Sequence, residues 1–169
     1  MKLVVFSDSH GIANIMRKIM AMHGDADVFV HLGDGVREFA AAAARYNGKR
    51  IISVAGNCDI PMPGKENPPS DAVAELDGFT IFFTHGHKYG VKYSDTALIA
   101  RARELGADAV FYGHTHIAHC EYMPPRDGLD EKSLYIVCPG SISQPRSGRP
   151  TYAIAETYRG RLICRIAEA

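Results

Sequence analysis

The chain has 169 residues, a length that suits one domain with one sizeable hydrophobic core. Its 19 Lys and Arg residues balance 19 Asp and Glu residues, which excludes a global electrostatic attraction to nucleic acid or to an anionic membrane. No apolar run approaches the roughly 20 residues of a membrane helix, and the first residues have the pattern of a strand rather than of a signal peptide. We therefore expect residues 1–169 to form a single cytoplasmic domain, with no membrane partner and no strong nucleic-acid signal.

The first half of the chain predicts three parallel strands that alternate with two helices. Apolar runs at 2–6, 27–32 and 49–55 predict strands, and such nearly continuous hydrophobicity is typical of strands buried in a parallel sheet. Between them, apolar residues at helical spacing over 12–22 and the alanine-rich stretch 36–46 predict helices. The order strand, helix, strand, helix, strand indicates a parallel sheet covered by helices.

The second half predicts a hairpin, one helix and further strands. Asp77-Gly78 is a strong turn signal between strands at 72–76 and 79–83. A helix is predicted over 94–105, with Ser94 as its N-cap. The remaining predicted strands are 108–112, 118–123, 133–138, 151–156 and 162–167. Three loops are predicted, at 60–70, 124–131 and 139–149. The first is rich in proline and is expected beside the functional site. The sequence leaves open the role of the third, which contains Ser141 and Arg146.

The four cysteines are widely spaced without a Cys-x-x-Cys pair, which disfavours a zinc knuckle or a disulfide framework. Free cysteine is among the most buried residue types, so we interpret Cys120, Cys138 and Cys164 as small strand residues. Histidine, with 8 residues, is the unusual count. His31 lies inside a predicted strand and is interpreted as a core histidine. Two histidines interpreted as ordinary surface or loop residues are His23 and His119.

Polar side chains follow five of the predicted strands at the point where each strand ends. Asp8 and His10 follow the first strand, and two such residues on an extended backbone point to the same side. Gly11 permits a tight turn into a helix whose free N–H groups would favour an anion. Because ligands bind at the carboxyl ends of strands in open α/β sheets, the five strand ends should converge. The other strand ends carry Asp34, Asn57, His85, and the pair His114 and His116.

This collection of two aspartates, one asparagine and four histidines is suited to metal binding. Carboxylate oxygens and imidazole nitrogens fit borderline divalent ions such as Mn²⁺, Fe²⁺ or Zn²⁺ better than Ca²⁺, which prefers oxygen ligands alone. Seven ligands are too many for one four-coordinate ion. The set therefore predicts two ions that share a bridging carboxylate.

The same residues resemble the sequence motifs of the calcineurin-like metallophosphoesterases. The resembling blocks, in the order of that family, are Asp8-x-His10, Gly33-Asp34, Gly56-Asn57-Cys58-Asp59, His85-Gly86-His87 and Gly113-His114-x-His116. The short chain and the variant Gly-Asn-Cys-Asp block resemble the YfcE-like group of small bacterial and archaeal phosphodiesterases. The resemblance implies an α/β fold, a four-layer αββα sandwich of two mixed β-sheets flanked by helices.

The resemblance also implies a dinuclear centre and its chemistry. Residue by residue, it assigns Asp8, His10 and His116 to a first ion, Asn57, His85 and His114 to a second, and Asp34 to a bridge between them. Manganese is the expected ion, with nickel, iron, cobalt and zinc as alternatives. Two such ions can clamp a phosphate and lower the pKa of a shared water, so that a bridging hydroxide attacks phosphorus in line with the leaving alkoxide. The expected substrate is a small phosphodiester.

The catalytic candidates are Asp34, Asn57, His114, Cys58 and His87. Cys58 stands where many relatives carry the histidine that is thought to protonate the leaving group. A thiol with a pKa of about 8.5 can give a proton but is a poor hydrogen-bond donor, so Cys58 is either a weak acid or a packing residue. Without a strong acid, esters with acidic leaving groups are favoured. His87 supports the ligands, contacts the phosphate or is a plain loop residue, and Asp59 is expected to orient a ligand histidine.

Two alternatives to a phosphodiesterase stay open. The fold resembles that of a eukaryotic retromer subunit, a non-catalytic protein-binding scaffold, although that relative lacks part of the histidine set kept here. The other alternative is a phosphomonoesterase or a nuclease, of which the nuclease is disfavoured by the neutral charge and by the lack of an accessory DNA-binding domain. Because the small relatives are often oligomers, a homo-oligomer is also expected.

Overall fold

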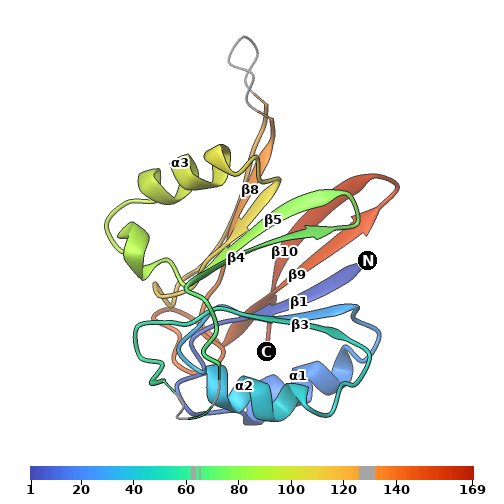
Figure 1. Cartoon of the computed structure of the whole chain (residues 1–169), viewed down its shortest axis with the longest axis vertical. Helices are drawn as coiled ribbons and strands as arrows, with labels where there is room; N and C mark the ends of the chain where they lie inside the picture. The colour runs from blue at the N-terminus through green and yellow to red at the C-terminus, as the bar shows by residue number, and fades with distance from the viewer. Residues whose placement is uncertain (62–63, 65, 126–131) are drawn as a thin grey trace.

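Two stacked five-stranded sheets make up the centre of the molecule in the computed structural model, and helices cover the outer face of each sheet (Figure 1). The structure describes residues 1–61, 64, 66–125 and 132–169, so residues 62, 63, 65 and 126–131 of the predicted loops lie outside the described residues. In spatial order, the first sheet contains β10 (Arg161–Glu168), β9 (Thr151–Tyr158), β1 (Lys2–Phe6), β2 (Val28–His31) and β3 (Arg50–Ser53). The second contains β4 (Asp71–Leu76), β5 (Phe79–Thr84), β6 (Ala109–Phe111), β8 (Leu134–Pro139) and β7 (Ala118–Met123).

Both sheets are mixed, as predicted. In the first sheet, β1, β2 and β3 pair in parallel, and β9 pairs antiparallel with both β1 and β10. In the second sheet, β5, β6 and β8 are parallel, while β4 and β7 are antiparallel strands at the two edges. The predicted Asp77-Gly78 turn is confirmed, because Leu76 pairs directly with Phe79 across it.

The continuous apolar run of β1 has a simple physical reason, namely that this strand is buried on both faces. Leu3 and Val5 point into the core between the two sheets, whereas Val4 and Phe6 point into the core under the helices. Alternate residues of a strand face opposite sides, so burial on both sides requires every residue to be apolar.

The helices complete a four-layer αββα sandwich, which confirms the expected fold. Helices α1 (Asn14–Met22) and α2 (Val36–Ala43) cover the first sheet, and α3 (Thr96–Glu104) covers the second (Figure 1). A short 3₁₀ helix, η1 (His87–Tyr89), follows β5. Between the sheets, Phe83 and Phe111 stack with ring centroids 5.8 Å apart. The carboxyl ends of the parallel strands in both sheets lie at the same edge of the sandwich, where backbone hydrogen bonds join neighbouring ends.

Some local predictions were wrong. Helix α1 begins two residues later than predicted, since the Ile12 N–H donates to the Ser9 carbonyl in a turn. Helix α3 begins at Thr96, with Asp95 rather than Ser94 at the N-cap position. Cys120 is exposed on the edge strand β7, although it does lie in a strand.

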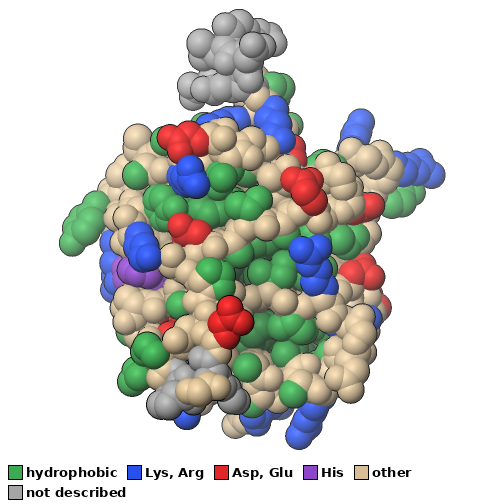
Figure 2. Space-filling view, viewed as in Figure 1, with side chains coloured by type: hydrophobic (Ala, Val, Ile, Leu, Met, Phe, Trp, Pro, Cys, Tyr) green, Lys and Arg blue, Asp and Glu red, His purple; other side chains and the backbone are tan. Residues whose placement is uncertain are grey.

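The molecular surface carries side chains of positive and of negative charge. On the face seen in Figure 2, basic and acidic side chains are interspersed rather than gathered into a region of one sign. Among the helices of the described residues, none has the length and apolar character needed to cross a membrane.

Candidate metal centre

The five predicted strand ends meet where the two sheets open toward the same edge. Hydrogen bonds between backbone groups join neighbouring ends: the Asp8 N–H donates to the Gly33 carbonyl at 3.0 Å, and the His10 N–H donates to the Asp34 carbonyl at 2.9 Å. In the second sheet, the Gly113 N–H donates to the His85 carbonyl at 3.2 Å. The side chains predicted as ligands lie in this region: Asp8, His10, Asp34 and Asn57 from the first sheet, and His85, His114 and His116 from the second.

Asp8, His10 and His116 form a first group whose ligand atoms all lie within 4.8 Å of one another. Nε2 of His116 lies 3.1 Å from Oδ1 of Asp8 and 3.1 Å from Nε2 of His10. The Nδ1–H of His116 donates to the Gln144 carbonyl at 2.8 Å, which leaves the lone pair on Nε2. Oδ1 of Asp8 is buried and has no hydrogen-bond partner within the described residues. Facing lone pairs of this kind fit a bound cation.

Asp34, His85 and His114 form a second group with the same close spacing of ligand atoms. The Nδ1–H of His85 donates to the Leu32 carbonyl at 2.7 Å, so its Nε2 lone pair faces the site. That Nε2 atom lies 3.4 Å from Oδ2 of Asp34 and 3.2 Å from Oδ1 of Asn57. Oδ2 of Asp34 is also 4.0 Å from Nε2 of His10 in the first group. The Asp34 carboxylate therefore lies between the two groups.

The electrostatics of the site favour ionised carboxylates. Burial raises the pKa of Asp34, but the contacts with His85 and the Cys58 N–H lower it more, so that the net pKa lies well below its ordinary value. Burial lowers the pKa of His85, and the carboxylates of Asp34 and Asp8 outweigh that effect and raise it. Burial, with His85 beside it, lowers the pKa of His114 to about 4. An ionised Asp34 and a neutral His114 are the protonation states that metal ligands need.

The backbone at these strand ends is strained. Five of the seven predicted ligands have positive φ angles: Asp8 (55°), His10 (43°), Asp34 (56°), His114 (68°) and His116 (59°). Among the other non-glycine residues that the structure describes, only Asp77 and Arg159 do so, and both lie in hairpin turns. A left-handed conformation costs a non-glycine residue on the order of 1–2 kcal/mol, and such strain concentrates at functional sites. The strained backbone directs these side chains toward the candidate metal centre and lowers the local stability of the fold.

Asp59 holds the loop that carries Asp34. Its Oδ2 accepts the backbone N–H groups of Asp34 at 2.7 Å and Gly56 at 2.8 Å. Its Oδ1 accepts those of Gly35 at 2.9 Å and Val36, the first residue of α2, at 3.0 Å. The prediction that Asp59 orients a ligand histidine is therefore wrong, because this carboxylate fixes the backbone of two strand ends and caps a helix.

The helix predicted to begin near Ile12 begins at Asn14, and Glu38 accepts donors of the turn that precedes it. Oε1 of Glu38 accepts the Gly11 N–H at 2.5 Å and the Ser9 hydroxyl at 3.0 Å. The Ser9 hydroxyl lies 3.0 Å from Nε2 of His31, whose Nδ1 accepts the Gly33 N–H at 3.2 Å. Burial lowers the pKa of His31 to about 4. His31 is thus the neutral, hydrogen-bonded core histidine that was predicted.

The loop 139–149 supports the Asp8 turn from behind. The Ser141 hydroxyl donates to the Asp8 carbonyl at 2.7 Å. The Ser143 hydroxyl lies within hydrogen-bond distance of the carbonyls of Asp8 (3.1 Å) and Ser9 (2.9 Å). The sequence left the role of Ser141 open and did not single out Ser143, since each bond spans more than 130 positions of the chain. The only sequence signal was a Ser-x-Ser pair in a loop between two strands.

Cys58 and His87 lie beside the second ligand group. The Cys58 N–H donates to Oδ1 of Asp34 at 2.7 Å, and desolvation together with that carboxylate raises the pKa of the Cys58 thiol to about 11. The ring of His87 lies 5.3 Å from that of His85 and 6.0 Å from that of His114, measured between centroids. Nδ1 of His87 is buried and has no hydrogen-bond partner within the described residues. His87 therefore has a free polar atom next to the ligand histidines.

Comparisons with known proteins agree with these features. Residues 1–160 match the family model described as a calcineurin-like phosphoesterase superfamily domain. The chain is similar to the probable metallophosphoesterase YsnB of Bacillus subtilis, with 32% identity over 156 residues that cover 91% of this chain and 83% of the relative. It is also similar to a probable metallophosphoesterase of Mycoplasma pneumoniae, with 30% identity over 168 residues, 95% of this chain and 92% of the relative.

Solved structures share the fold over nearly the whole chain. A predicted phosphoesterase of Streptococcus pneumoniae superposes with a TM-score of 0.73 and 26% identity, covering 98% of this chain and 97% of that one. An archaeal phosphodiesterase gives a TM-score of 0.72 at 23% identity, covering 99% and 100%. Vps29 of Entamoeba histolytica, solved in complex with zinc, gives 0.69 at 20% identity, covering 99% and 98%. At such identities the last two likenesses concern the fold alone.

Proposed function

Because the chain belongs to the calcineurin-like phosphoesterase superfamily, we propose that it hydrolyses phosphodiesters at a centre of two divalent metal ions. The observation that carries the proposal is the pair of ligand groups at one sheet edge, with the Asp34 carboxylate between them. The buried Oδ1 atom of Asp8, which lacks a hydrogen-bond partner within the described residues, adds to this support.

In this proposal each ligand group holds one ion. The ligands are Asp8, His10 and His116 for the first ion, Asn57, His85 and His114 for the second, and Asp34 for both. Manganese suits this mixture of nitrogen and oxygen donors, and nickel, iron, cobalt and zinc are the alternatives. When bound, two such ions supply Lewis acidity to the phosphoryl oxygens and an activated water for in-line attack.

The residues around the ligands orient them and handle protons. The carbonyls of Leu32 and Gln144 fix the tautomers of His85 and His116, so that both Nε2 lone pairs face the site. The unpartnered Nδ1 of His87 is placed to contact a phosphate oxygen. The Cys58 thiol, whose pKa is raised to about 11, is a weak acid, and we therefore expect faster hydrolysis of esters with acidic leaving groups.

The direct test is hydrolysis of bis(4-nitrophenyl) phosphate by the purified protein supplied with Mn²⁺, followed by nitrophenolate release. We expect turnover that EDTA abolishes, with kcat/KM at least about tenfold higher than for the monoester 4-nitrophenyl phosphate. Absence of turnover on both esters with Mn²⁺, Ni²⁺, Co²⁺ and Zn²⁺ would contradict the proposal. Faster hydrolysis of the monoester would contradict the diester preference and favour a phosphomonoesterase.

A protein-binding scaffold of the same fold is the alternative, because the solved neighbours include several Vps29 proteins. Metal binding does not separate the two functions, since one of these Vps29 structures contains zinc. Hydrolysis does separate them, and a chain that binds metal without cleaving any ester would favour the scaffold. We further propose that residues 1–169 act as one cytoplasmic domain on a small substrate, as a monomer or a homo-oligomer.

A further inference from the structure

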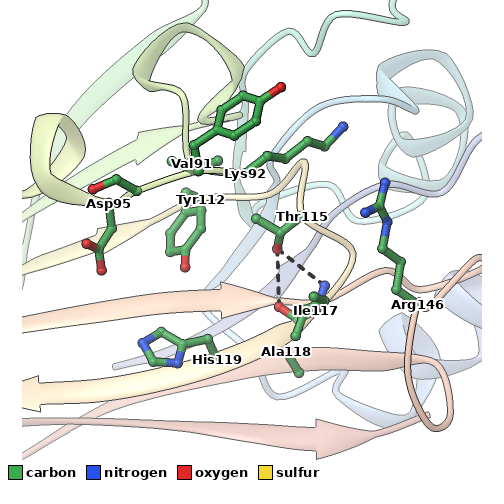
Figure 3. Close-up of a pocket in the computed structure, with 11 residues that line it drawn as sticks. Val91, Lys92, Asp95, Tyr112, Thr115, Ile117, Ala118, His119 and Arg146 are labelled. Carbon is green, nitrogen blue, oxygen red and sulfur yellow. Dashed lines mark hydrogen bonds between the residues drawn. The ribbon is translucent and has the colours of Figure 1, made fainter.

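A pocket of about 420 Å³ opens around Thr115 (Figure 3). Its walls come from the segment 91–95, from residues of the segment 112–119, and from Arg146. Thr115, which lines it, stands between the predicted ligands His114 and His116 in the chain. A volume of this size exceeds what a single phosphate group needs and falls within the range of small-molecule sites.

Two cationic side chains, Lys92 and Arg146, line this pocket. Lys92 contributes to the lowered pKa of His114, and Arg146 acts in the same direction on His116, so each positive charge lies near one ligand. The backbone N–H of Arg146 also donates to the His116 carbonyl at 3.1 Å. In Figure 3 the charged ends of both side chains extend toward the same end of the pocket, past Thr115.

Neither of these cations has a neutralising partner in the described part of the chain. No ion pair or side-chain hydrogen bond of Lys92 or Arg146 occurs among the residues that the structure describes. Some other cations of the described residues are paired, as Lys132 is with Asp108 at 2.8 Å. In a chain with a net charge of zero, two unpaired cations at one pocket form a local site for an anion.

The rest of the pocket offers apolar surface and one unpaired polar group. The Tyr93 side chain is 95% exposed at the pocket, and Ile117 is 50% exposed. Tyr112 is 6% exposed, and its hydroxyl has no hydrogen-bond partner among the described residues. An exposed aromatic ring and a hydroxyl without a protein partner are both able to contact an organic ligand.

A second pocket, which is lined by the proposed ligands His10 and Asp34, has less favourable charges for an anion. It is lined by one cation, Arg37, but also by the carboxylates of Glu38 and Asp59, which the proposal assigns to neither ion. Coulombic repulsion there disfavours a second phosphate, whereas the pocket with Lys92 and Arg146 has a single carboxylate, that of Asp95.

We propose that the pocket with Lys92 and Arg146 binds one alcohol arm of the phosphodiester, and that this arm carries a second phosphate group held by the two cations. The inference rests on the proposed function, because it places the reacting phosphate at the metal centre. The guanidinium of Arg146 presents a fork of donors that matches phosphate oxygens, and the ammonium of Lys92 adds a second charge. Tyr93, Tyr112 and Ile117 pack against the body of the arm. The substrate class is a phosphodiester of a phosphorylated alcohol.

The first test measures binding without turnover. Calorimetry on the Mn²⁺-loaded protein compares the bisphosphates of ethylene glycol, 1,3-propanediol and 1,4-butanediol with the matching monophosphates. We expect at least one bisphosphate to bind about tenfold or more tightly than its monophosphate, because its second phosphate reaches the cations. Lys92→Gln and Arg146→Gln each remove most of this advantage. Lys88→Gln, which deletes an exposed lysine outside the pocket, keeps it.

Equal affinities for mono- and bisphosphates in the wild-type protein would overturn the inference. It would also be overturned if the Lys88 control lost as much bisphosphate affinity as the two pocket variants. The inference would also be overturned if Arg37→Gln were the single variant that lost the tighter binding of bisphosphates. That result would place the second phosphate in the pocket lined by Arg37.

The second test measures turnover of two 4-nitrophenyl phosphodiesters, one with the free diol and one with its monophosphate as the second alcohol. The phosphorylated diester is expected to have a KM lower by about tenfold at similar kcat, and both pocket variants should erase that difference. Equal KM values with good turnover would contradict the inference and leave the proposed function standing. Absence of turnover on both diesters would contradict the proposed function, while the calorimetry would still decide the inference.

Discussion

Asp34 has a strained backbone, and its carboxylate contacts both ligand groups. Its backbone adopts a φ of 56°, and its Oδ1 is held by the Cys58 N–H at 2.7 Å. Its Oδ2 is left to face His85 and His10 from the two ligand groups. Replacing this carboxylate removes the shared contact of both groups, whereas replacing the thiol of Cys58 leaves the backbone N–H of that residue in place.

The first prediction compares these neighbours. Asp34→Ala is expected to lower kcat/KM for bis(4-nitrophenyl) phosphate by roughly 100-fold or more, because a ligand matters at least as much as the groups that support ligands. Cys58→Ala is expected to keep most of the activity, since a thiol with a pKa of about 11 donates protons poorly. Steady-state kinetics with circular dichroism of both variants measure this. A Cys58 variant as inactive as the Asp34 variant would assign the thiol an essential role.

The second prediction concerns Asp59, whose carboxylate accepts four backbone N–H groups. Asp59→Asn puts an amide NH₂ against two of these donors and loosens the Asp34 loop. We expect the affinity for Mn²⁺ to fall by roughly 10–100-fold, measured by calorimetric titration. Because hydrogen bonds to a charged group each contribute about 1.5–3 kcal/mol, the free energy of unfolding should fall as well. Wild-type metal affinity in this variant would show that the loop holds its shape without Asp59.

The third prediction concerns the buried histidine of β2. The pKa of His31 is about 4 in the folded protein against an ordinary value of 6.5 for the unfolded chain, so between these values the unfolded chain binds a proton that the folded chain excludes. Stability is therefore complete above pH 6.5 and falls as the pH drops toward 4, by roughly 3 kcal/mol at about 1.4 kcal/mol per unit. Urea unfolding at neutral and acidic pH should show a smaller loss for His31→Gln than for wild type. Identical losses would mean that other groups cause the acid sensitivity.

At the scale of elements, the two sheets touch through the ends of β1 and β6. A Cβ atom at Gly113 would collide with Oγ of Ser7 and lie 2.9 Å from Oδ2 of Asp8. Oδ2 of Asp8 also accepts the His114 N–H at 3.0 Å. The glycine after β6 is therefore required by the close approach of the strand end that carries Asp8.

The fourth prediction tests this contact with two matched glycines that both lack a positive φ. Gly113→Ala should displace Asp8 and weaken Mn²⁺ binding by about tenfold or more. Gly24→Ala, where the nearest neighbouring atom lies 3.7 Å from the added Cβ, should leave metal binding unchanged. Calorimetric titration of both variants gives the comparison. Equal metal affinities would show that the strand ends shift without disturbing the site.

At the scale of the whole molecule, the proposed ligands come from both sheets. Asp8 lies at the end of β1, whereas His114 and His116 follow β6 in the other sheet. A metal ion bound by both sheets acts as a link across the sandwich and binds the folded chain only.

The fifth prediction follows from that link. Mn²⁺ at about 100 times its dissociation constant should add roughly 2.7 kcal/mol to the free energy of unfolding, which raises Tm by about 5–10 °C for a chain of this size. Scanning calorimetry before and after addition of EDTA measures the shift. An Asp34→Ala variant should show a smaller one. A wild-type Tm that does not respond to Mn²⁺ would contradict metal binding across the sheets.

Much of this architecture was readable from local patterns. The run Leu3-Val4-Val5-Phe6 predicts a strand buried on both faces, and the Asp77-Gly78 turn predicts a hairpin; the structure confirms both. The starts of α1 and α3 were predicted two residues early, because a turn and a cap position depend on hydrogen bonds that composition does not show. The candidate ligands were found because polar residues directly follow apolar strands.

The sequence by itself determined which residue types stand at the strand ends, since hydrophobic runs and the glycines that end them are local features of the chain. Only the tertiary structure decided which groups meet there. Three features join segments that are far apart in the chain. They are the four backbone N–H groups bound by Asp59, the serines behind the Asp8 turn, and the presence of both Lys92 and Arg146 at one pocket. The physical reason is that such contacts depend on how the two sheets stack and on how loops from different strands close over one edge.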